Sequence, residues 1–128
     1  MAQLVVYGHA AALRPRIAEL SDALHAAAVE ALRLPSEKRF HRFVPLDPDC
    51  FIAPPDRGPD YTIVEVSMFE GRTTETKKAY LRAIFARLGE LGIAPNDVEV
   101  TITETPRENW GIRGLPGDEL ALSYRVEV

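Results

Sequence analysis

Cysteine is almost absent from this chain, which limits how the fold can be held together. Cys50 is the only cysteine among 128 residues, so no disulfide can form within the chain. The apolar runs near the N-terminus are too short and too mixed for a signal peptide or a membrane span. We therefore expect a cytoplasmic protein without membrane contact, long enough to bury its own core.

Positive charge is not in excess either. The formal net charge is -4 and the isoelectric point is near 5.4. A non-specific nucleic-acid binder normally carries a basic patch or domain. We expect no nucleic acid as a partner, and mild acidity by itself indicates no other one.

Metal-binding and phosphate-binding patterns are missing as well. His9, His25 and His41 are widely spaced, with no Cys, His or carboxylate beside them at metal-ligand spacing. The glycines of residues 111–117 are not followed by the Lys-Ser/Thr of a phosphate loop. We expect neither a metal nor a cofactor.

Residues 61–114 predict a complete strand, helix and strand that end in a glycine-rich turn. Strand formers occupy residues 63–68, residues 73–91 carry the apolar stripe of a helix, and residues 97–103 alternate between apolar and polar. Thr73 is a suitable cap for the start of the helix. This half of the chain is therefore one β-α-β unit.

The first 46 residues repeat the same order. Residues 4–7 predict a buried strand, an apolar stripe from Leu13 to Leu34 predicts a helix, and residues 38–46 predict a strand in which Pro45 marks an end or an edge. A crossover of this length makes the two strands of a unit parallel. Two such units side by side predict an α+β fold with a four-stranded mixed sheet and two helices on one face.

The resulting single domain has four parts: a first β-α-β unit (1–46), a proline-rich linker (47–60), a second unit (61–114) and a C-terminal strand (115–128). Residues 119–128 alternate without a break. A strand of this kind at the end of a chain needs a partner edge, because an unpaired one invites aggregation.

Two motifs resemble the tautomerase superfamily, in particular 4-oxalocrotonate tautomerase and malonate semialdehyde decarboxylase. They are Phe-Glu-Gly-Arg-Thr at residues 69–73 and Trp-Gly-Ile-Arg-Gly at residues 110–114. The resemblance implies the tautomerase fold. It also implies a homotrimer in which the C-terminal strand joins the sheet of a neighbouring subunit.

The family's catalytic base is an N-terminal proline that is exposed when the initiator methionine is removed, and this chain has Ala2 in that place. A primary amine on Ala2, present only if Met1 is removed, has a reference pKa of roughly 8. Burial in an apolar pocket lowers an amine pKa toward neutrality. Base chemistry therefore remains available to Ala2, although it is less well tuned.

Arg72 aligns with the family arginine that binds the substrate carboxylate, and its alternative role is an ion pair with Glu75. Trp110 aligns with the aromatic residue of the pocket wall, and its alternative is a core or interface tryptophan. Arg113 adds a second anion contact or faces solvent.

Other positions depart from the family pattern. Lys38 replaces the aspartate that activates water in the decarboxylase branch, and Glu70 and Glu99 stand where second arginines occur. Hydratase or decarboxylase chemistry and a dianionic substrate are therefore disfavoured. Lys38 and His41, near the start of the second strand, remain candidates for substrate binding.

The first hypothesis for function is a weak keto–enol tautomerase or isomerase that acts on a small carboxylate-bearing substrate. The alternative is a non-catalytic trimer that binds a small anion or is purely structural. A third interpretation, a ferredoxin-like binding module, predicts a dimer.

Overall fold

The computed structural model describes residues 2–128, in which the two repeats form one mixed sheet. The strand order is β2-β1-β3-β4. β1 is parallel to β2 and β3 is parallel to β4, whereas β1 and β3 are antiparallel. The strands are β1 (Ala2–His9), β2 (Phe40–Leu46), β3 (Thr62–Phe69) and β4 (Val98–Thr105). The predicted α+β fold is thus confirmed.

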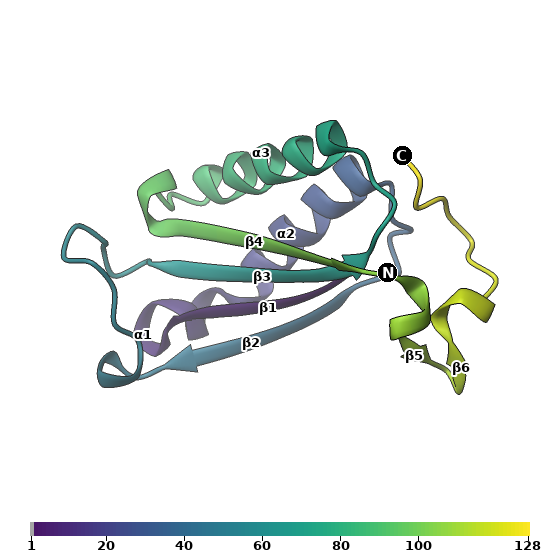
Figure 1. The fold of residues 1–128 in the computed structure, drawn as a ribbon. Helices are drawn as coiled ribbons and strands as arrows, with labels where there is room; N and C mark the ends of the chain where they lie inside the picture. The colour runs from purple at the N-terminus through teal and green to yellow at the C-terminus, as the bar shows by residue number, and fades with distance from the viewer. Residues whose placement is uncertain (1) are drawn as a thin grey trace.

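The helices α2 and α3 lie side by side over one face of the sheet (Figure 1). The predicted first helix is interrupted, because a 3-10 turn that contains Pro15 separates its first turn from its main part. The elements are α1 (Ala10–Leu13), η1 (Arg14–Arg16), α2 (Ile17–Leu32) and α3 (Thr74–Glu90). Within the described chain, no helix is long and apolar enough to cross a membrane.

The remaining elements are short. They are the 3-10 turns η2 (Pro48–Cys50), η3 (Pro95–Asp97), η4 (Arg107–Asn109) and η5 (Gly117–Glu119), and the hairpin strands β5 (Gly111–Ile112) and β6 (Leu115–Pro116). Pro45 lies in β2, which is an edge strand. An edge strand has no neighbouring strand on one side, so it tolerates a proline, which has no N–H to donate.

One face of the sheet forms the core and the other is uncovered in the single chain. Leu4 and Val6 of β1 and Val64 and Val66 of β3 are buried under the helices. The residues between them are half-buried or exposed. Alternation of this kind is the period of a strand with one buried face. The strand at residues 4–7 was predicted to be buried, and the structure buries only one of its faces.

The start of α3 fixes the position of Arg72. Thr73 caps the helix, since its hydroxyl oxygen accepts a hydrogen bond of 3.1 Å from the N–H of Thr76, as predicted. At the far end, Gly92 adopts φ +87°, the left-handed conformation that closes a helix. Arg72 directly precedes the cap.

The predicted strand at residues 119–128 is not formed within the single chain. The tail is irregular, yet its burial alternates and Val126 is fully buried. The Thr73 N–H donates a 2.9 Å hydrogen bond to the Val128 carbonyl, which holds the tail beside α3. A single chain does not test pairing with a neighbouring subunit, so that pairing stays a prediction.

Candidate active site

The candidate site lies at the end of the sheet where β1 begins and β3 and β4 end. Ala2 is paired with Met68, and Met68 is paired with Glu104 on the next strand. Three neighbouring strands thus place these residues in one row, with about 10 Å between its outer members. In Figure 1 the N-terminus and the C-terminal segment meet at this end.

Arg72 extends from the turn after β3 and is only 5% exposed. Its Nε, Nη1 and Nη2 atoms are buried and have no hydrogen-bond partner within residues 2–128. The alternative ion pair with Glu75 is not formed in this part of the chain. A buried cation without a partner is rare, because removing its charge from water costs free energy that no partner offsets. The burial of Arg72 therefore needs an explanation.

Tyrosine and glutamate side chains surround the guanidinium. Burial lowers the pKa of Arg72, while the nearby Tyr124, Glu104, Tyr80 and Glu127 act in the opposite direction. Glu104 receives a 2.7 Å hydrogen bond from Lys77 on Oε1, but its buried Oε2 has no partner among the described residues. The same holds for the hydroxyl of Tyr80. Arg72, Tyr80 and Glu104 are thus neighbouring side chains that each have a buried polar atom without a hydrogen-bond partner in the described residues.

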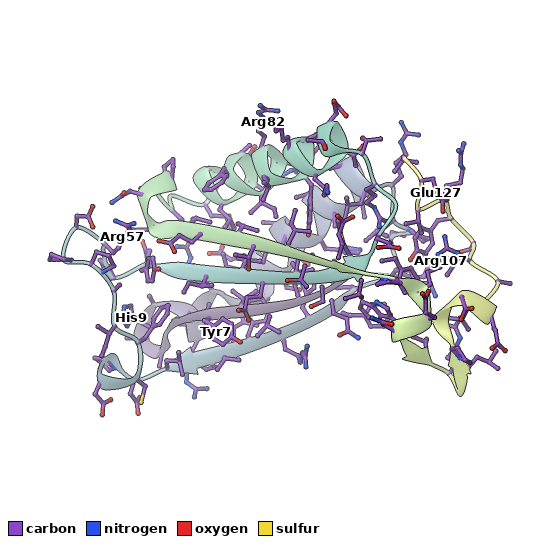
Figure 2. All side chains as sticks on the ribbon, in the orientation of Figure 1. Tyr7, His9, Arg57, Arg82, Arg107 and Glu127 are labelled. Atoms are coloured by element: carbon purple, nitrogen blue, oxygen red, sulfur yellow. The ribbon has the colours of Figure 1, made fainter. Side chains whose placement is uncertain are left out.

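The C-terminal tail covers this place. Val126 packs against Phe69, and a Cβ added to Gly71 would lie 3.3 Å from the Val126 Cγ1. Arg107 and Glu127 form a 3.3 Å ion pair there, and Figure 2 shows both side chains beside the tail. The tail thus contacts the residues on both sides of Arg72, Gly71 and Thr73.

Trp110 forms part of the wall next to the tail. Its ring stands edge-on to Phe69, with centroids 5.2 Å apart and planes at 83°. Its Nε1 donates a 2.7 Å hydrogen bond to the hydroxyl oxygen of Thr105. Trp110 packs against Phe69 and Val126, which form a small second core, and its role in the pocket wall stays a prediction.

His41 lies on the helix side of β2. Its Nδ1 is 2.8 Å from the hydroxyl oxygen of Ser21 on α2. Burial, assisted by the neighbouring His25 and Arg39, lowers the pKa of His41 to about 4. The ring is therefore neutral at physiological pH and joins a strand to a helix.

Lys38 and Arg113 both lie outside the four-stranded sheet. Lys38 is half-buried in the turn before β2, where its N–H donates to the Pro35 carbonyl at 3.0 Å. Arg113 is exposed at the tip of the β5–β6 hairpin with φ 52°. In the part of the chain that the structure describes, no hydrogen bond or ion pair connects either residue to Arg72.

Sequence reasoning missed Tyr80, Glu104 and Tyr124. Tyr80 occupies the buried stripe of α3 with Ile84 and Leu88, at steps of four residues. A tyrosine in such a stripe needs a hydrogen-bond partner for its buried hydroxyl. This requirement could have identified Tyr80 as a candidate site residue from the sequence. The position of Tyr124 depends on the path of the tail, which local patterns do not specify.

No group of three or more His, Cys, Asp or Glu side chains within residues 2–128 is arranged to hold a metal ion. The candidate site therefore consists of a cation, two phenols and carboxylates. Such a set can bind an anion and donate hydrogen bonds to it.

Comparisons with known proteins agree with this arrangement. The family of tautomerase enzymes matches residues 38–113. A 2-hydroxymuconate tautomerase from Pseudomonas putida is 44% identical over 57 residues, which are 44% of this chain and 90% of that protein.

Solved structures share the fold over almost the whole chain. A malonate semialdehyde decarboxylase called FG41, inhibited by 3-bromopropiolate, has a TM-score of 0.81 and 31% identity and covers 94% of this chain and 98% of its own. An asymmetric trimer of a fused 4-OT has a TM-score of 0.79 and 24% identity, with 91% and 96% covered.

Proposed function

Because the chain belongs to the family of tautomerase enzymes, we propose that it is a keto–enol tautomerase for a small substrate with one carboxylate. The buried Arg72 guanidinium, without a hydrogen-bond partner in the described residues, is the observation that carries this proposal. A planar guanidinium binds a carboxylate through two parallel hydrogen bonds. A ligand carboxylate would give the buried charge the partner that residues 2–128 do not supply.

The charges around Arg72 favour one carboxylate rather than two. Glu104 and Glu127 are close enough to Arg72 to interact with it electrostatically. Glu99 stands where the resemblance places a second arginine, and it is a carboxylate paired with Arg57 at 3.3 Å, so this position supplies no cation for a second carboxylate. The other cations at this cluster are already paired with carboxylates: Lys77 with Glu104 at 2.7 Å and Arg107 with Glu127 at 3.3 Å. A second negative group on the ligand would have to compete with these carboxylates.

The amine of Ala2, freed by removal of Met1, is the proposed base. Ala2 is 3% exposed, and burial lowers an amine pKa toward neutrality. In the reaction, the amine takes the proton of the enol hydroxyl, the C–O bond becomes a carbonyl, and the electrons of the C=C bond take a proton from the ammonium at the carbon that does not bear the oxygen. The substrate and product have the same formula, so no further reactant is needed.

We propose that the working form is a homotrimer. The uncovered face of the sheet contains half-buried apolar side chains such as Val5 and Ile63, which neighbouring subunits would cover. A fused 4-OT with the same fold is a trimer. If the tail joins a neighbouring sheet, as the sequence predicts, the cover over Arg72 is removed at the same time.

The non-catalytic alternative has one observation in its favour, which is Ala2 in the place of the proline. Two measurements separate the alternatives: the ultraviolet absorbance of an enolised 2-oxo acid, and calorimetric titration with pyruvate. Arg72→Ala should weaken pyruvate binding by about 2–3 kcal/mol, whereas the control Glu75→Ala should leave it unchanged. Arg72-dependent binding without faster loss of the enol would support the non-catalytic trimer, and binding unaffected by Arg72→Ala would contradict both.

A further inference from the structure

The hydroxyl of Tyr80 is a polar group buried under helix α3. Tyr80 is 0% exposed and faces the sheet from α3, together with Ile84 and Leu88. Its hydroxyl oxygen has no partner within residues 2–128. Native proteins rarely leave a buried tyrosine hydroxyl unpaired, so the missing partner indicates a molecule from outside the chain.

Tyr80 is a neighbour of Arg72. The two side chains interact electrostatically, and each influences the titration of the other. Burial raises the pKa of the Tyr80 hydroxyl, with the Arg72 charge opposing this shift. The hydroxyl therefore keeps its proton at physiological pH and acts there as a neutral hydrogen-bond donor.

The groups around this point differ in what they can offer a ligand. Arg72 supplies charged donors, Tyr80 supplies one neutral donor, and the unpartnered Oε2 of Glu104 is an acceptor. A carboxylate suits the guanidinium. The carbon next to the carboxylate can bear an uncharged oxygen, and this oxygen can accept the single neutral hydrogen bond that the Tyr80 phenol donates.

We propose that Tyr80 is a specificity residue that donates its O–H to the 2-oxygen of a 2-oxo acid, or of its enol, whose carboxylate is bound by Arg72. The inference rests on the proposed function only for the assignment of the carboxylate to Arg72. During keto–enol exchange, negative charge grows on the same oxygen, and a donor already in position stabilises it. The protein should thus prefer 2-oxo acids to plain carboxylates of equal size.

The test compares two ligands that differ at one atom position. Pyruvate and propionate have carboxylates of the same kind, but propionate lacks the 2-oxygen. Calorimetric titration of Tyr80→Phe should show pyruvate binding weakened about tenfold, the usual effect of one lost hydrogen bond, and propionate binding unchanged. Arg72→Lys should weaken both acids together, because it alters the carboxylate contact. Tyr7→Phe removes a hydroxyl at the uncovered face of the sheet and should change neither.

Thermal melts separate this role from a structural one. Since the hydroxyl has no partner in the described chain, Tyr80→Phe should leave the melting temperature unchanged or raise it. The inference is overturned if Tyr80→Phe melts earlier with pyruvate binding intact, if both acids are weakened equally, or if wild type binds pyruvate no better than propionate. A preference for pyruvate that depends on Tyr80, in a protein without enol turnover, would support the inference and refute the proposed activity.

Discussion

The hydroxyl oxygen of Ser21 and the Nδ1 of His41 lie 2.8 Å apart and join helix α2 to the edge strand β2. Near them, the rings of His25 and His41 have centroids 6.0 Å apart, and His25 Nε2 lies 2.7 Å from the Ser36 carbonyl oxygen. These contacts connect the first helix to the strand that follows it. They give His41 a hydrogen-bond partner and a ring partner between α2 and β2.

Acid should destabilise the protein through His41. Its pKa is about 4 in the folded chain and near 6.5 when unfolded, so the unfolded state binds more protons between these values. Stability is therefore complete above about pH 6.5 and falls toward pH 4, by up to about 3 kcal/mol. Urea unfolding at several pH values checks this expectation. His41→Gln should flatten the loss, while the control His9→Gln should not; parallel curves for wild type and His41→Gln would exclude His41 as the cause.

Much of the fold was predictable because local patterns specify its elements. The strand formers of β1 and β3, the alternation in β4 and the cap at Thr73 are such signals, and the structure confirms these elements. The tail shows the limit of such signals. Its alternating burial was predictable, but its path over Phe69 depends on contacts between residues far apart in sequence.

The candidate site was less predictable for the same reason. The motif indicated Arg72, but its lack of a partner could only be seen once all its neighbours were placed. His41 was expected on a strand near the pocket. In the structure it pairs with Leu4, whose side chain is buried in the core, and its role in substrate binding stays a prediction.

Gly71 should be indispensable for the closed tail. It has φ +129°, and an added Cβ would lie 3.3 Å from Val126. Gly71→Ala should cost about 1–3 kcal/mol because this backbone conformation disfavours side chains and the tail has to shift. Gly89, in α3 with no atom within 4 Å of an added Cβ, is the matched control. Gly89→Ala should stabilise by about 0.5–1 kcal/mol, and equal effects of both changes in urea unfolding would contradict the assigned role of Gly71.

Assembly should depend on the tail. Native mass spectrometry is expected to give a mass near three times 14.2 kDa. Deletion of residues 119–128 removes Val126 from the fully buried Phe69 and also removes the segment predicted to pair with a neighbour. The shortened protein should dissociate or precipitate, because apolar surface and strand edges become exposed. A stable, soluble monomer after deletion would refute the interlocked trimer.

A proline at position 2 should increase catalysis. Ala2→Pro, with Met1 removed and its removal verified by mass spectrometry, places a secondary amine where the family keeps its base and fixes φ there. The buried position of Ala2, 3% exposed and paired with Met68, favours a lowered amine pKa. Enol loss followed by absorbance should therefore be faster than in wild type. Ala2→Ser keeps a primary amine and should not increase the rate of enol loss. Adding Arg72→Ala to the proline variant should abolish the increase in rate. If the proline variant is no faster, the pocket around residue 2 does not support base chemistry.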